Sequence, residues 1–404
     1  MKFPSFLKFG PATLITAAFI GPGTVTVCSI AGASAGFTLL WGMIFSIVAT
    51  ILLQEMVARI TLASEISVEQ NLMGIFKRRI TQRLIGMLIL LILFFGNTAY
   101  QTGNLLGAEL GIELILRPFD IADEIGLYLI VILFVSALLL WIGNITIIKN
   151  LMLFLVALMS FSFVIAAVLS QPDIFSMLKG MFIPSIPEGQ SLVLVSIIGT
   201  TVVPYNLFLY SYLVNNNYTG KTLKDIRVDL IKSVLIGGVI SFSVIVVAAS
   251  KEGTLIKNAA DLAVFLEPTY GNLSYYLIGV GLFSAGISSA IIAPLAISMI
   301  AINVFGWKER LEDIRARILW MIVLLLGFVF AYISYKPIEV IKIAQFLNGL
   351  LLPLMAILLL YLVNKRSTMK TFKNLWYHNL VSTVVILICV ILGLKSIFSV
   401  LNLI

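Results

Sequence analysis

Residues 196–215 read SIIGTTVVPYNLFLYSYLVN, and a second apolar stretch at residues 17–32 reads AAFIGPGTVTVCSIAG. Each carries helix-breaking residues near its middle: Gly-Pro-Gly at 21–23 in one, Gly199 and Pro204 in the other. A proline inside a helix removes one backbone hydrogen bond and clashes with the preceding turn, and glycine weakens a helix further. We therefore expect both helices to break at mid-membrane. Broken backbone in hydrocarbon is tolerated only where it lines a cavity or is buried in protein.

The composition assigns the whole chain to a membrane. Hydrophobic residues make up 60% of the 404 residues and charged residues only 11%, against about 25% charged residues in soluble domains. The two cysteines, Cys28 and Cys389, lie inside apolar runs, which supports neither a disulfide framework nor a thiolate metal site. We therefore expect a polytopic membrane protein rather than an enzyme, and we expect no cofactor.

Eleven apolar runs are long enough to span a bilayer, which takes about 17–25 residues per helix. The chain is therefore predicted to be an all-α integral membrane protein, with residues 1–404 forming one transmembrane domain. The predicted spans are 11–32, 38–60, 84–115, 126–143, 149–170, 191–214, 231–250, 272–303, 317–335, 338–363 and 377–402.

The basic residues predict the orientation of the chain. Most of the 27 lysines and arginines fall in loops on the side of the N-terminus, and such loops are retained in the cytoplasm. With an odd number of spans, the C-terminus is expected outside. The net charge of +8 then reflects membrane topology, so we expect no nucleic acid and no obligatory protein partner. The predicted location is the bacterial plasma membrane.

A weaker internal symmetry indicates a transporter. Pro22 and Pro204 lie near the starts of two groups of five spans, residues 1–170 and 191–363, and an odd number of spans makes the second group run inverted. Five-plus-five inverted repeats with broken first helices are a known transporter architecture, with the substrate between the breaks. Residues 377–404 are then an extra helix. The predicted hinges are Pro22, Gly23, Gly199 and Pro204.

Several motifs resemble the Nramp family of divalent-metal transporters. The segment GTTVVPYNLFLYSYL at 199–213 resembles the family's sixth-span signature, Met-Pro-His-Asn followed by apolar residues and Leu-His-Ser. The opening stretch, LLQEMVARI in span 2, GLFSAGISSAI in span 8 and QFLNGLLLPLMAIL in span 10 extend the similarity over almost the whole chain. The resemblance implies a LeuT-like fold and metal ion transport by alternating access.

The chain departs from the family at the metal site. Carried over position by position, the family's metal-binding aspartate falls on Gly21, a following asparagine on Thr24 and the metal-binding methionine on Val203. The two histidines of span 6 become Tyr205 and Tyr210. The usual transition-metal ligands are therefore missing from the positions that the resemblance points to.

The family's proton route is altered as well. In span 3 its aspartate and glutamate fall on Gln101 and Asn104. The family's polar residues survive elsewhere, as Asn206 in span 6 and Gln345 in span 10. Glutamine, asparagine and tyrosine do not titrate near neutral pH. Proton coupling by the family's usual groups is therefore not expected.

The remaining ligands favour a hard, hydrated ion. A thioether favours transition ions such as manganese, oxygen ligands favour magnesium, and magnesium keeps several waters in most sites. A dehydrated divalent ion without counter-charge faces a large desolvation penalty, so we expect neutral oxygens to contact a hydrated, magnesium-like ion, or manganese. The predicted substrate-binding residues are Gly21, Thr24, Val203, Thr200, Tyr205, Asn206, Gln345 and Ala18, with Thr24, Thr200 and Gln345 as metal ligands directly or through water. The predicted pathway residues are Gln101, Asn104 and Tyr210.

Other readings stay open. With the aspartate gone, N–H groups at a helix break suit an anionic group, so a small non-metal solute is one alternative and a non-transporting membrane sensor is another. The polar residues also have simpler explanations. Thr24 can bond back to the preceding turn, and Gln101 and Asn104, one turn apart, can make inter-helix hydrogen bonds. Glu55 and Arg59, spaced i to i+4, are expected to pair.

Overall fold

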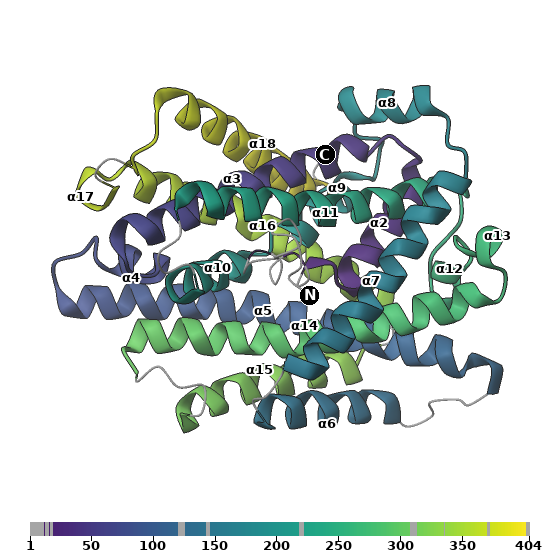
Figure 1. The fold of residues 1–404 in the computed structure, drawn as a ribbon, viewed down its shortest axis with the longest axis horizontal. Coiled ribbons are helices and arrows are strands. Elements are labelled where there is room, and N and C mark those ends of the chain that lie inside the picture. The colour runs from purple at the N-terminus through teal and green to yellow at the C-terminus, as the bar shows by residue number, and fades with distance from the viewer. Residues whose placement is uncertain are drawn as a thin grey trace, which may run out of the picture.

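The computed structural model describes residues 12, 16, 19–119, 126–142, 146–217, 222–307, 313–334, 336–369 and 372–400. In these ranges the secondary structure consists of helices with turns between them and no strand (Figure 1). The helices, in chain order, are α2 (Pro22–Ala35), α3 (Leu40–Ser64), α4 (Val68–Met73), α5 (Arg79–Leu116), the 3-10 helix η2 (Arg117–Phe119), α6 (Leu127–Ile142), α7 (Thr146–Leu169), α8 (Ile174–Phe182), α9 (Ser191–Thr201), α10 (Pro204–Asn217), α11 (Leu223–Ala249), α12 (Ala259–Ala263), α13 (Glu267–Tyr270), α14 (Leu273–Phe305), α15 (Ile314–Tyr332), α16 (Pro337–Asn364), α17 (Arg366–Met369) and α18 (Trp376–Val400).

The expected all-α membrane protein is confirmed. Within the described ranges, eight stretches are long and apolar enough to cross a membrane, and one of them, Ser191–Asn215, runs through α9 and α10. A ninth candidate combines α7 with α8, which meet at 119°. Each predicted span overlaps a helix or a broken pair of helices. The exact number of eleven spans and the five-plus-five repeat stay predictions.

The two longest described helices, α5 and α14, lie against each other through the middle of the molecule (Figure 1). Small residues allow this close approach: a Cβ added to Gly111 would lie 2.4 Å from the backbone nitrogen of Phe283, and one added to Gly286 would lie 2.7 Å from that of Ala108. Small residues are typical of helix contacts in membranes, where lipid supplies no hydrophobic driving force between helices. The pair forms a support against which α2, α10 and α16 pack.

Both predicted helix interruptions are confirmed. α9 ends at Thr201 and α10 begins at Pro204, and between them Val202 has φ −99° and ψ 74°, outside the helical range. α2 begins at Pro22, and the preceding Gly21 is extended, with φ −110° and ψ −176°. Proline fits the first position of a helix because the N–H that it lacks would have no intrahelical partner there.

Gly199, one of the predicted hinges, lies close to the second break, and its role as a hinge stays a prediction. Gly199 lies inside α9, three residues before Val202. A Cβ added to Gly199 would lie 1.9 Å from the carbonyl oxygen of Gln345 and 2.6 Å from the backbone nitrogen of Gly349. Glycine is required at this position because α9 and α16 touch backbone to backbone, whereas Pro204 and the two residues before it interrupt the helix.

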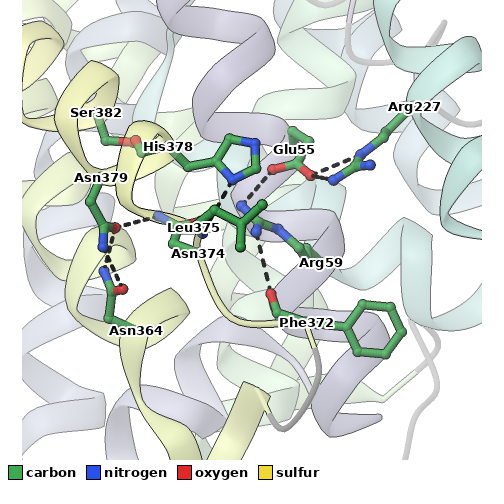
Figure 2. A network of polar contacts seen from close by, with 10 residues as sticks. All are labelled: Glu55, Arg59, Arg227, Asn364, Phe372, Asn374, Leu375, His378, Asn379 and Ser382. Carbon is green, nitrogen blue, oxygen red and sulfur yellow. Dashed lines mark hydrogen bonds and ion pairs between the residues drawn. The ribbon is translucent and has the colours of Figure 1, made fainter.

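Two arginines hold Glu55 at one end of the bundle (Figure 2). The expected pair with Arg59 is confirmed at 2.9 Å between Nη2 and Oε2, and Nη2 of Arg227, on α11, lies 2.6 Å from Oε1. Arg59 also donates to the carbonyl of Phe372, 3.3 Å away, in the segment before α18. The Arg59 side chain is only 5% exposed, so Glu55 neutralises a buried cation and joins α3 to α11.

Three asparagines next to this network join α16 to α18 (Figure 2). Asn364 and Asn379 exchange hydrogen bonds of 2.8 and 2.9 Å between their side-chain amides. Asn374 also donates to Oδ1 of Asn379, at 2.7 Å. The extra helix predicted at the C-terminal end is therefore attached to α16 by paired amides.

We expect Glu55→Ala to destabilise the protein strongly, because it leaves the buried Arg59 without a counter-charge, and removing one partner of a buried pair costs about 3–5 kcal/mol. Arg227→Ala is the matched control. The Arg227 side chain is 43% exposed, and exposed ion pairs contribute about 0–1 kcal/mol. Thermal unfolding in detergent measures both variants. Equal loss of stability in the two would contradict this account of the network.

Candidate functional site

Gln345 of α16 lies where the two interrupted segments come together. A Cβ added to Gly23, in the first turn of α2, would lie 2.0 Å from Nε2 of Gln345, so the carboxamide rests directly on the Gly23 backbone. The backbone carbonyl of Gln345 meets Gly199 of α9. The residue is 1% exposed, and its Oε1 has no hydrogen-bond partner among the described residues. Gln345 thus contacts both broken segments and keeps an acceptor oxygen unused.

The start of α2 is fixed by contacts with α5 and with its own break. A Cβ added to Gly107 of α5 would lie 2.1 Å from Cβ of Pro22, so only glycine lets the proline pack there. Across the break, the Thr24 hydroxyl donates to the carbonyl of Phe19, five residues back. That bond reaches past the preceding helical turn to a carbonyl upstream of the interruption. Thr24 therefore satisfies backbone that the break has left unpaired.

The second break presents several buried polar groups. The Thr200 hydroxyl donates to the carbonyl of Ile197 at 2.9 Å, which is the simple back-bond to its own helix. Asn206, in the first turn of α10, is 1% exposed, and neither Oδ1 nor Nδ2 has a partner within the described part of the chain. The ring of Tyr205 lies 5.5 Å from the ring of Tyr100 on α5, measured between centroids. Val203 is buried and apolar, so it offers no side-chain ligand.

Unpaired amides are the unusual feature of this region. Most buried polar groups in proteins are hydrogen-bonded, and leaving one unpaired costs about 1–3 kcal/mol. Besides Asn206 and Gln345, the described residues include Asn348, whose Nδ2 is unpartnered, and Thr26, whose Oγ1 is unpartnered. Asn348 was not predicted from the sequence, although its position one turn after Gln345 on α16 is a signal for it. Water or a polar solute would satisfy these groups.

The residues described above at the two helix breaks carry no charged side chain. No cluster of three or more His, Cys, Asp or Glu side chains that could hold a metal ion occurs in the ranges that the structure describes. The predicted site residues Gly21, Thr24, Thr200 and Gln345 are all buried. Ala18 was also predicted here, but it lies outside the described residues. The chemistry available is therefore contact by neutral oxygens and amides, without a counter-charge for a bare divalent ion.

The sequence matches the family profile described as natural resistance-associated macrophage protein-like (Nramp) over residues 12–399. The chain belongs to the Nramp family. It is 25% identical over 393 residues to the divalent metal cation transporter MntH of Caldanaerobacter subterraneus subsp. tengcongensis, covering 93% of this chain and 89% of that protein. The MntH of Chromohalobacter salexigens is 27% identical over 321 residues, 75% of this chain and 73% of that protein. Both relatives are named as transporters and not as enzymes.

Solved structures agree with this Nramp assignment at the level of the fold. A mutant of the Eremococcus coleocola manganese transporter has a TM-score of 0.78 at 19% identity, covering 99% of this chain and 89% of that chain. MhsT in complex with L-phenylalanine has a TM-score of 0.59 at 16% identity, covering 95% of this chain and 98% of that chain. At these identities the comparisons establish the fold alone.

In this Nramp chain, the predicted pathway residue Gln101 has a structural partner. Its Nε2 donates to the carbonyl of Ala290 on α14, at 3.2 Å. Pro294, four residues later in α14, lacks the N–H that would normally pair with that carbonyl. Gln101 therefore satisfies a carbonyl of α14 that has no partner within its own helix. This favours the inter-helix explanation for Gln101. Asn104, one turn along α5, keeps an unpartnered Nδ2 within the described structure.

Asn97, one turn before Gln101, belongs to the same face of α5 and was not singled out from the sequence. Its Nδ2 donates to the carbonyl of Ala293, at 2.5 Å, next to Pro294. Tyr210, the third predicted pathway residue, is fully buried in α10. The role of Tyr210 and Asn104 along a pathway stays a prediction.

We expect Gln101→Leu to destabilise the protein, because it leaves the Ala290 carbonyl unpaired, at a cost of about 1–3 kcal/mol. In a Pro294→Ala background the new N–H pairs with that carbonyl, so the same substitution should cost less. Thermal unfolding of the four proteins forms a double-mutant cycle, which isolates the interaction between the two positions. An identical cost in both backgrounds would show that Gln101 does not compensate for the N–H that Pro294 lacks.

Proposed function

We propose that this Nramp protein is a secondary transporter that moves a divalent cation across the membrane as a hydrated, magnesium-like ion. The observation that carries the proposal is the neutral site at the two helix breaks, where Oε1 of Gln345 and both amide atoms of Asn206 lack partners among the described residues. Amide oxygens and freed carbonyls are acceptors that can bond to the water shell of a cation. Magnesium gives up its waters reluctantly and usually keeps several when bound.

The relatives support a divalent cation as the cargo, because both MntH proteins are named divalent metal cation transporters. The residues of this chain support a hydrated ion over bare manganese. Val203 stands where a soft thioether ligand is expected and Gly21 where a carboxylate is expected. Without either group, direct transition-metal ligation loses its usual advantage, and manganese becomes the second candidate for the transported ion.

Alternating access is the mechanism that we propose for entry and release. The candidate residues Thr24, Asn206 and Gln345 are between 1% and 2% exposed, so the solute reaches them only if helices move. The interrupted helices supply places for that movement, and rocking of the first two helices of each repeat against the others is the expectation for this architecture. We place the N-terminus in the cytoplasm and the C-terminus outside, in a bacterial plasma membrane.

Transport is proposed to proceed down the electrochemical gradient of the ion without protons. At the positions where the family has titratable side chains, this chain has Gln101, Asn104, Tyr205 and Tyr210. None of these side-chain types changes charge near neutral pH. One of them, Gln101, already donates its amide to α14.

Ion flux into liposomes tests the proposal. We expect magnesium influx above empty vesicles, unchanged by an imposed proton gradient, and a loss of about tenfold or more in Gln345→Leu. Gln190→Leu is the control, because Gln190 bonds Ser34 at an exposed position and its loss should leave flux unchanged. Fluorescent reporters follow magnesium, calcium and manganese separately. If no cation moves, the proposal of a divalent cation as cargo is wrong. A small non-metal solute is then the remaining candidate, and thermal-shift screening with small anionic metabolites would identify it.

Gly21→Asp should raise the affinity for divalent cations. Gly21 is extended, with φ −110°, so aspartate fits without backbone strain, and aspartate is a favoured residue just before a helix. A gain of at least about 1.4 kcal/mol, tenfold in Kd, is expected in titration calorimetry, with manganese gaining most.

Gly21→Asn is the matched control for this substitution, since it has nearly the same shape without the charge. An unchanged affinity in Gly21→Asp, with the protein still folded, would show that the ion does not approach this break.

A further inference from the structure

Glu69 is a carboxyl group that the proposed transport site does not use. It lies in the first turn of α4, the short helix between α3 and α5, and is 0% exposed. Its Oε1 accepts a 2.7 Å hydrogen bond from Nδ2 of Asn303 on α14. Its Oε2 has no hydrogen-bond partner in the described part of the chain. A carboxyl group with one free oxygen is thus closed off from solvent between two helices.

No basic side chain on the described elements around α4 neutralises Glu69. α10 and α14 contain no Asp, Glu, Lys, Arg or His, and the tyrosines on the packed helices do not titrate near neutral pH. The charged residues of the other packed elements and adjoining turns are paired, exposed or far along α5. They are the pairs Glu55 with Arg59 and Glu339 with Lys342, the exposed Glu65, Lys77, Arg78, Arg79 and Arg83, and, near the opposite end of α5, Glu109 and Glu113.

Neutral contacts hold α4 against its neighbours. The hydroxyl of Ser211, on α10, accepts a 3.0 Å hydrogen bond from the backbone N–H of Val68 and lies 2.8 Å from the hydroxyl of Thr61 on α3. Val68 and Leu72 share a small apolar cavity with side chains of α10 and α16. Since α10 is the half-helix that follows the second break, α4 connects a broken segment to the intact helix α14.

We propose that Glu69 is a proton-binding site that latches α4 against α10 and α14. Burying a carboxylate without a cation is costly, so the packed arrangement holds the proton. An arrangement that lets water reach α4 releases it. This inference concerns a group apart from the helix breaks and stands whether or not the protein carries magnesium.

The direction of the pH effect follows from burial. Burial raises the pKa of Glu69 from 4.5 to about 7, against opposing hydrogen bonds, of which the one from Asn303 is the largest and those from the Glu69 backbone and Ser67 follow. A raised pKa means that the packed arrangement binds the proton more tightly than the open one. The packed arrangement is therefore favoured most below the ordinary pKa, loses its advantage as the pH rises to about 7, and changes no further above that.

Infrared titration of the purified full-length protein reads the proton directly. We expect the carbonyl band of a protonated carboxylic acid to disappear with a midpoint near pH 7 in the natural protein. Glu69→Gln should lack this band, and Glu65→Gln, which changes an exposed carboxylate four residues earlier, should keep it. A band that persists in Glu69→Gln, or one that titrates below pH 5, would overturn the proposal.

Amide hydrogen exchange at α4 tests the latch itself. After correction for intrinsic base catalysis, opening of α4 should increase between pH 5 and 7, by at most about tenfold per pH unit for one proton. It should level off above pH 7, and Glu69→Gln should show no such rise. Should Glu69→Gln fail to fold, Asn303→Ala serves instead, because losing the opposing hydrogen bond should move the infrared midpoint upward. An unmoved or lowered midpoint, or the same rise in Glu69→Gln, would overturn the proposal.

Discussion

Backbone groups freed at a helix break must find partners, because an unpaired N–H or C=O in hydrocarbon costs several kcal/mol. In this protein the partners are specific. The Thr24 hydroxyl pairs with the carbonyl of Phe19 across the first break, and the carboxamide of Gln345 rests on Gly23 while its carbonyl meets Gly199 at the second segment. Pro294 in α14 obeys the same rule, with Gln101 pairing the carbonyl that the proline leaves free. Several interior polar side chains of this chain therefore serve to pair backbone carbonyls that lack a partner within their own helix.

The candidate site is defined by the buried amides whose polar atoms are not used to pair backbone groups. Asn206, Gln345 and Asn348 keep buried polar atoms without partners in the described structure, and no carboxylate cluster accompanies them there. A neutral site can stabilise an ion only through dipoles, which are too weak to replace the whole water shell of a divalent cation. Because the site has no carboxylate to replace that shell, we expect the transported ion to keep its water. The lack of a carboxylate also separates the site from Glu69, whose buried carboxyl carries the one proton-linked change that we infer.

The sequence predicted best what depends on neighbouring residues. The breaks at Pro22 and Pro204 were predictable because proline acts on its own turn, and the pair of Glu55 with Arg59 because i to i+4 spacing brings them together. The contact of Arg227 with Glu55 and the bond from Gln101 to Ala290 depend on helices far apart in the chain, so no local pattern could reveal them. The close contact of Gly199 with the backbone of α16 could not be predicted for the same reason. The burial of Glu69 was missed because a short polar helix between two spans resembles an exposed loop.

A density map of the protein with hexaamminecobalt(III) tests the central claim most directly. The ammine ligands of this complex do not exchange, so it mimics a cation that keeps its full shell and binds only where such a shell fits. The account predicts density between the start of α2 and the gap from α9 to α10, with the ammine ligands against Gln345. Binding of the complex elsewhere, together with bare manganese held directly by protein atoms between the breaks, would contradict it.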